Sequence, residues 1–158
     1  MTAGILIVSD RCASGKMEER TGPAIRKVLE EKGWTAGEYA VVPDDQGEIG
    51  KTLKDWADVK GLHLVLTAGG TGLGPRDVTP EATRAVIEKE ADGLVHLMRA
   101  EGLKHTARAA LSRGIAGTRK NTLIVNLPGS PRGAEESLRA ILDVVPHAVA
   151  MMRGEGHE

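Results

Sequence analysis

The sequence predicts an α/β fold built on a mainly parallel sheet, and three observations support this. Short, almost continuous apolar runs such as residues 4–9 are typical of strands that are covered on both faces. Such runs alternate along the chain with segments of helical periodicity, which predicts crossover connections between parallel strands. The chain has 158 residues, of which 41% are hydrophobic and 27% charged. These numbers fit one domain over residues 1–158, without a linker or an internal repeat.

The first expected elements are a strand over residues 4–9 (GILIVS) and a helix over residues 21–32. Thr21 is the expected N-cap of this helix and Gly33 its C-terminal stop, since hydroxyl residues and glycine favour those positions. The apolar residues of the segment recur at helical spacing, namely Ile25, Val28 and Leu29.

A second strand is expected over residues 39–42, and it ends at Pro43. A second helix follows, marked by apolar residues at i, i+4 and i+7: Ile49, Leu53 and Trp56. Residues 62–67 (LHLVLT) predict a third, buried strand. The glycine-rich residues 68–78 form a loop, after which Thr79-Pro80-Glu81 predicts a helix that runs toward Glu90. That triplet offers a hydroxyl cap, a proline at the first position and an acid in the first turn.

The last third of the chain predicts another helix from about Asp92, two strands and a final helical region. The strands cover residues 115–119 and 122–126, and a tight turn at residues 120–121 joins them. A loop then leads into a helix over residues 133–144, followed by one or two helical turns over residues 146–153 and a polar tail.

Composition excludes several classes of protein. The formal net charge is −1, and only three residues are aromatic, which argues against a nucleic-acid partner. No apolar run approaches the ~20 residues of a membrane helix, and the N-terminus has no signal-peptide pattern. The single Cys12 excludes an internal disulfide and a structural zinc site, and the scattered histidines do not suggest a metal site. We therefore expect a cytoplasmic protein that acts on small molecules and has no membrane partner.

Four loops should meet at one edge of the sheet, where ligands bind in open α/β folds. They cover residues 9–11, 43–46, 67–80 and 126–131. The third loop has four glycines in six positions, which permit positive φ and a close approach to a ligand. Its successive backbone N–H groups are suited to binding a phosphate. The alternative interpretation of the same glycines is a flexible turn without a ligand. The loop is not a dinucleotide fingerprint, because Pro75 stands where that motif needs its last glycine. Elsewhere in the chain, Gly50-Lys51-Thr52 has the ending of a Walker A loop, but Asp45 stands where that motif needs its first glycine.

Two aspartates, Asp44 and Asp77, follow strands in separate loops of this edge. Mg²⁺ is typically held by one or two carboxylates together with substrate phosphate oxygens, so this pair predicts a magnesium site and catalytic residues. Each aspartate alone could instead be a cap or turn residue, as we expect for Asp45. The same alternative stays open for Ser9-Asp10, and the neighbouring Arg76 could be a solvated surface side chain.

The motifs at this edge resemble those of the Mog/MoaB family, in the same order and over nearly the whole chain. They are Ser9-Asp10, Pro43-Asp44-Asp45, Gly69-Gly70-Thr71-Gly72, Arg76-Asp77-Val78-Thr79-Pro80-Glu81-Ala82, Leu111-Ser112-Arg113 and Leu127-Pro128-Gly129-Ser130-Pro131. The resemblance implies a three-layer α/β/α sandwich, a homotrimer and a role in molybdenum cofactor biosynthesis. The implied reaction transfers AMP from Mg-ATP to the terminal phosphate of molybdopterin and releases pyrophosphate. A molybdate-inserting enzyme of the same pathway is an implied partner.

The resemblance also assigns residues to the implied reaction. Asp44 and Asp77 would be catalytic and would hold Mg²⁺. The implied nucleotide- and pterin-binding residues are Ser9, Asp10, Thr67, Gly69, Gly70, Thr71, Gly72, Arg76, Ser112, Pro128, Gly129 and Ser130. Two alternatives stay open: a non-catalytic pterin-binding or scaffold member of the fold, and a nucleotide hydrolase. The presence of both aspartates favours catalysis over a binding or scaffold role. A hydrolase would need a water-activating group near the loop, and residues 67–80 contain no His or Glu.

Overall fold

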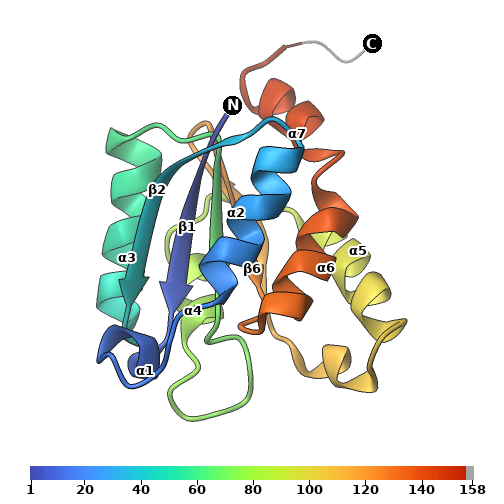
Figure 1. Cartoon of the computed structure of the whole chain (residues 1–158). Helices are drawn as coiled ribbons and strands as arrows, with labels where there is room; N and C mark the ends of the chain where they lie inside the picture. The colour runs from blue at the N-terminus through green and yellow to red at the C-terminus, as the bar shows by residue number, and fades with distance from the viewer. Residues whose placement is uncertain (156–158) are drawn as a thin grey trace.

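The computed structural model describes residues 1–155, and these form a six-stranded sheet with helices on both faces (Figure 1). The strands are β1 (Thr2–Val8), β2 (Thr35–Val42), β3 (Leu64–Ala68), β4 (Lys89–Glu90), β5 (Ala116–Arg119) and β6 (Thr122–Leu127). They lie in the order β2-β1-β3-β6-β5-β4. The first four in this order run parallel, while β5 and β4 are antiparallel to their neighbours. The mainly parallel sheet predicted from sequence is confirmed.

The helices form the two outer layers of a three-layer sandwich. They are α1 (Asp10–Ala13), α2 (Thr21–Glu31), α3 (Gln46–Lys54), the π-helical turn η1 (Asp55–Val59), α4 (Thr79–Arg84), α5 (Asp92–Leu103), the 3-10 helix η2 (Ala107–Leu111), α6 (Pro131–Ile141) and α7 (Val145–Met152). Helices α2, α5, α6 and α7 pack on one face of the sheet, and α3, η1 and α4 pack on the other. None of the helices within residues 1–155 is long and apolar enough to span a membrane.

Each central strand contributes side chains to two separate cores because successive residues point to opposite faces. In β1, Ala3, Ile5 and Ile7 join the core under α2 and α6, whereas Leu6 and Val8 join the core under α3 and α4. This explains why residues 4–8 form a continuous apolar run rather than alternating with polar residues.

The helix predicted from Thr79 toward Glu90 is shorter than expected, since α4 ends at Arg84. The chain then turns, and Lys89 and Glu90 pair with β5 as an edge strand, while the N–H of Glu88 donates to the Thr118 carbonyl at 2.7 Å. Pairing with a distant strand overrides the local helical pattern here.

Both threonines predicted as N-caps have other partners. Helix α2 is preceded by Arg20 and α4 by Val78, neither of which caps the helix with its side chain. The Thr21 hydroxyl donates to the Gly129 carbonyl at 2.7 Å, and the Thr79 hydroxyl donates to the Gly69 carbonyl at 2.9 Å. The helix starts are thus tied to glycine loops, which local sequence could not show.

The remaining differences are small. Strand β2 begins four residues earlier than the predicted residue 39, at Thr35, where its pairing with β1 starts. The predicted stop at Gly33 has φ +78°, and the predicted turn places Lys120 at φ +50°. The end of the predicted polar tail, residues 156–158, lies outside the described residues.

Candidate active site

Four parallel strands end level with one another, and this brings the four predicted loops to one edge of the sheet. Val8 pairs with Val42, and Ala68 pairs with both Ile7 and Leu127, so the carboxyl ends of β1, β2, β3 and β6 lie side by side (Figure 1). Residues 9–11, 43–46, 67–80 and 126–131 leave the sheet from these ends. The edge predicted from sequence is therefore formed.

Asp10 and Asp44 join the first two loops through a reciprocal pair of hydrogen bonds. The backbone N–H of Asp10 donates to Oδ2 of Asp44 at 2.9 Å, and the backbone N–H of Asp44 donates to Oδ1 of Asp10 at 2.9 Å. Each carboxylate thereby fixes the backbone that carries the other. Such charge-assisted bonds to backbone N–H groups are stronger than neutral ones.

Arg76 extends this arrangement to the glycine loop. Its Nε and Nη2 donate to the two carboxylate oxygens of Asp10, both at 3.0 Å. These hydrogen bonds lower the pKa of Asp10, followed in effect by its bond from the Asp44 backbone. Both oxygens of Asp10 are therefore engaged within the protein, and Asp10 and Arg76 connect residues 67–80 to the end of β1.

The pKa of Asp44 is shifted in the opposite direction from that of Asp10. Its carboxyl is half-buried, and burial raises its pKa above the ordinary value, assisted by the negative charges of Asp10 and Asp77. The hydrogen bond from the Asp10 backbone opposes this rise only in part. A carboxylate whose negative charge is disfavoured by neighbouring carboxylates is suited to a cationic partner.

The glycine loop approaches other backbone segments so closely that side chains would not fit. Gly69 has φ +105°, and a Cβ atom there would collide with the carbonyl of Val8. Gly70 has φ +68°, and its Cβ position is blocked by the Thr79 hydroxyl and lies 3.0 Å from Oδ1 of Asp44. Gly129 of the last loop packs against Gly69, with its Cβ position 3.2 Å from the Gly69 Cα.

Asp77 folds back onto the same loop. Its Oδ2 accepts the N–H of Gly74 at 2.9 Å, and the same oxygen lies 2.9 Å from the Cβ position of Gly72. Within residues 1–155, the backbone N–H groups of residues 70–73 donate to no protein acceptor. Four successive unpaired N–H groups beside two aspartates provide donors for phosphate oxygens.

Asp44 and Asp77 could contribute to a cation site, but they do not form a closed metal cage by themselves. Both carboxylates border the glycine loop, and the negative charge of Asp77 contributes to the raised pKa of Asp44. The part of the chain that the structure describes has no group of three or more His, Cys, Asp or Glu side chains able to hold a metal. Two carboxylates completed by substrate phosphates are, however, a common Mg²⁺ arrangement.

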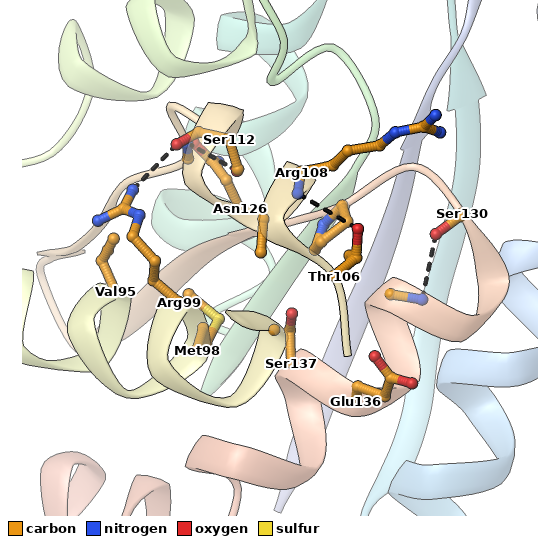
Figure 2. A pocket seen from close by; sticks show the side chains of 15 residues that line it. Val95, Met98, Arg99, Thr106, Arg108, Ser112, Asn126, Ser130, Glu136 and Ser137 are labelled. Atoms are coloured by element: carbon orange, nitrogen blue, oxygen red, sulfur yellow. Dashed lines mark hydrogen bonds between the residues drawn. The ribbon is translucent and has the colours of Figure 1, made fainter. Parts of the chain in front are cut away.

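Two cavities flank the loop that follows β6. One, of about 470 Å³, is bordered by predicted residues Ser9, Gly69, Gly129 and Ser130. The other, of about 300 Å³, lies among α5, η2 and α6 (Figure 2) and is bordered by Ser112, Pro128 and Ser130. Ser130 borders both cavities, and its Oγ accepts the N–H of Gly133 at 3.1 Å as the cap of α6. Neither Asp44 nor Asp77 lines either of these two cavities.

Thr67 and Thr71 lie beneath the surface of this edge, 0% and 7% exposed. The Thr67 hydroxyl accepts from Nδ2 of Asn126 at 2.9 Å, and the same amide donates to the Thr83 hydroxyl at 2.9 Å. Oδ1 of Asn126 accepts the N–H of Ile115 at 3.1 Å. This network supports the loops from within the sheet.

The predicted set of binding and catalytic residues omits three residues of the site: Arg99, Arg113 and Asn126. Asn126 lies in the predicted loop 126–131, where it is a polar residue at the end of an apolar strand. Arg113, which belongs to the Leu-Ser-Arg motif, forms four side-chain hydrogen bonds to the glycine loop and α4. Arg99 donates to the Ser112 carbonyl at 2.9 Å beside the smaller cavity (Figure 2), and no signal in the sequence pointed to it.

Comparisons with known proteins place this geometry in a family. A family model described as a probable molybdopterin binding domain matches residues 4–147. The molybdopterin adenylyltransferase of Helicobacter pylori (strain J99) is 41% identical over 96% of this chain and 87% of its own length. The Drosophila melanogaster molybdenum cofactor synthesis protein cinnamon is also 41% identical, but the chain spans only 26% of its length.

A solved structure agrees with these sequences. The molybdopterin biosynthesis enzyme MoaB of Thermus thermophilus is 52% identical, and the match covers 99% of both chains with a TM-score of 0.92. The family model matches most of the chain, and the adenylyltransferase of Helicobacter pylori and the MoaB structure match it over 87% and 99% of their own lengths. The chain therefore belongs to the Mog/MoaB family of molybdopterin-binding domains.

Proposed function

We propose that this protein is a molybdopterin adenylyltransferase, which transfers AMP from Mg-ATP to the terminal phosphate of molybdopterin in molybdenum cofactor biosynthesis. The observation that carries the proposal is the placement of Asp44 and Asp77 against one glycine loop with unpaired N–H groups within the described residues 1–155. The identity of 41% to an adenylyltransferase over 96% of the chain supports the same activity.

The reaction is an adenylyl (nucleotidyl) transfer, which needs no covalent intermediate on the protein. A terminal phosphate oxygen of molybdopterin attacks the α-phosphorus of ATP, one P–O bond forms, the bond to the β-phosphate breaks, and pyrophosphate leaves. The nucleophile is a phosphate monoester with a second pKa of about 6, so it is largely dianionic at neutral pH. A general base is therefore not required, and positioning and charge neutralisation supply the catalysis.

The residues of this edge are suited to those tasks. The N–H groups of residues 70–73 bind phosphate oxygens, and the reciprocal Asp10–Asp44 bonds keep Asp44 oriented beside them. Asp44 and Asp77 would hold Mg²⁺, which when bound supplies positive charge that neutralises the phosphates. The two cavities beside Ser130 offer separate room for a nucleotide and a pterin.

Other parts of the proposal rest on the family resemblance. We infer that the protein is a homotrimer located in the cytoplasm and that its product passes to a molybdate-inserting enzyme. Analytical ultracentrifugation tests the trimer, and a sedimenting mass of one or two chains contradicts it.

The activity is tested by incubating the purified protein with ATP, Mg²⁺ and molybdopterin and analysing the products by mass spectrometry. We expect adenylated molybdopterin and an equal amount of pyrophosphate, and neither product without Mg²⁺. Pterin binding without transfer would show a non-catalytic member of the family. Release of ADP and phosphate would show a hydrolase, and either result overturns the proposal.

A further inference from the structure

Arg113 spans the glycine loop from one end to the other. It lies between η2 and β5, and its Nε donates to the Gly72 carbonyl at 2.8 Å while its Nη2 donates to the Asp77 carbonyl at 3.0 Å. Its backbone N–H also donates to the Thr71 carbonyl at 2.8 Å. A residue 36 positions beyond Asp77 thus fixes the backbone on both sides of the loop.

Glu81 holds the guanidinium of Arg113 in place. Its two carboxylate oxygens accept from Nη1 at 2.8 Å and from Nη2 at 3.1 Å. This contact is the main reason that the pKa of Glu81 is lowered and that of Arg113 raised. The paired geometry of two nitrogens facing two oxygens fixes the plane of the guanidinium, which a lysine could not reproduce.

The loop has few other bonds that define its shape. Within the chain as described, its internal backbone bonds between residues 70 and 79 are those from Asp77 N–H to the Gly74 carbonyl and from Thr79 N–H to the Gly70 carbonyl, both at 3.1 Å. The carbonyls of Gly72 and Asp77 have Arg113 as their partner. Glycine loses more conformational freedom on ordering than any other residue, so such a loop depends on outside contacts.

We propose that Arg113 is a positioning residue for AMP transfer, oriented by Glu81. It holds the N–H groups of the loop and the backbone of Asp77 in the arrangement that receives the substrate phosphates, without touching the substrate. Because Nε, Nη1 and Nη2 all donate to protein oxygens, the guanidinium is committed to the loop rather than available to a phosphate. This inference rests on the proposed function.

The chain offers a matched control in Arg119, which makes the same kind of contacts away from the loop. Its Nε and Nη2 donate to the two oxygens of Asp58 at 2.9 and 2.8 Å, and its Nη1 donates to the Val86 carbonyl at 2.9 Å. Replacing either arginine removes one paired carboxylate contact and the backbone carbonyl contacts beside it. Only the replacement of Arg113 should change the arrangement of the glycine loop.

The test compares Arg113→Gln and Arg113→Lys with Arg119→Gln, by steady-state kinetics and by hydrogen exchange of single amides. For both Arg113 variants we expect kcat for AMP transfer to fall on the order of 100-fold, as for misplaced catalytic groups. The amides of Gly74 and Asp77 should exchange about 10-fold faster or more, since their bonds open as the loop loosens. Arg119→Gln should leave both quantities as in the wild type.

The exchange measurement separates this proposal from the proposed function, because it needs no substrate. Faster exchange at Gly74 and Asp77 confined to the Arg113 variants supports the positioning role of Arg113 even if the wild type transfers no AMP. Unchanged exchange overturns that role, as does an equal change in Arg119→Gln. Wild-type kcat in the Arg113 variants, with an active wild-type enzyme, overturns it as well.

Discussion

Asp10 and Asp44 each accept the backbone N–H of the other, at 2.9 Å in both directions. The two residues follow different strands, β1 and β2, so this exchange connects loops that are 34 positions apart in sequence. Oδ2 of Asp44 is fixed by the N–H of Asp10, while Oδ1 of Asp44 faces Gly70. The position of a candidate catalytic carboxylate is therefore determined by a neighbouring carboxylate that is itself paired with Arg76.

The first prediction concerns the orienting role of Asp10. Asp10→Ala removes the acceptor of the Asp44 N–H, so we expect kcat for AMP transfer to fall about 10-fold or more, as a misplaced catalytic group does. Asp10→Asn retains an amide oxygen for that N–H and should lose less. Steady-state kinetics on both variants test this, and equal activity of Asp10→Ala and the wild type would contradict it.

The second prediction follows from the raised pKa of Asp44. A carboxyl with a higher pKa in the folded than in the unfolded protein binds its proton more tightly when folded. Its favourable contribution is fully present below the unfolded value and is lost as pH rises through the folded value. At pH 7 the wild-type carboxyl is ionised and its negative charge destabilises the folded protein, whereas the amide of Asp44→Asn carries no charge. The free energy of unfolding of Asp44→Asn should therefore exceed that of the wild type at pH 7.

Urea unfolding at several pH values between 4 and 7 measures this difference. We expect the stability advantage of Asp44→Asn over the wild type to grow as pH rises. An advantage that shrinks with rising pH, or a variant less stable than the wild type at pH 7, would show that the folded protein favours the ionised form of Asp44.

The third prediction concerns Gly69. Gly69→Ala forces a left-handed backbone on alanine and pushes a Cβ atom into the Val8 carbonyl. We expect a loss of roughly 2–5 kcal/mol in the free energy of unfolding, combining about 1–2 from backbone strain with about 1–3 from overpacking. Gly33→Ala is the control, since Gly33 has φ +78° with open space around it. It should lose only about 1–2 kcal/mol, and equal losses would contradict the steric explanation.

Much of the fold could be predicted because local patterns and tertiary structure agree. Residues 4–9 and 62–67 are apolar enough to be buried on both faces, and β1 and β3 are central strands. The pattern failed after Thr79, where pairing of Lys89 with Thr118 of β5 ended the helix early. Such pairing depends on residues about 30 positions away, and local sequence carries no trace of it.

In the candidate site, too, some features could be predicted from the sequence and others depend on contacts between distant residues. The meeting of Asp44, Asp77 and the glycine loop followed from the rule that parallel strands end at one edge. The internal roles of Asp10 and Arg76, which pair with each other, and of Thr67, which lies in a buried network, required coordinates. Arg113 was visible as part of a motif, but only the structure shows that its side chain reaches Gly72, Asp77 and Glu81.

The proposed function depends most on Asp77, which we expect to act in AMP transfer rather than in pterin binding. The most direct measurement is made on Asp77→Ala, by following adenylated molybdopterin by mass spectrometry and molybdopterin binding by calorimetry in parallel. We expect binding close to that of the wild type and a loss of transfer on the order of 100-fold or more, as for removed charge-stabilising groups. Wild-type transfer by Asp77→Ala would contradict this role.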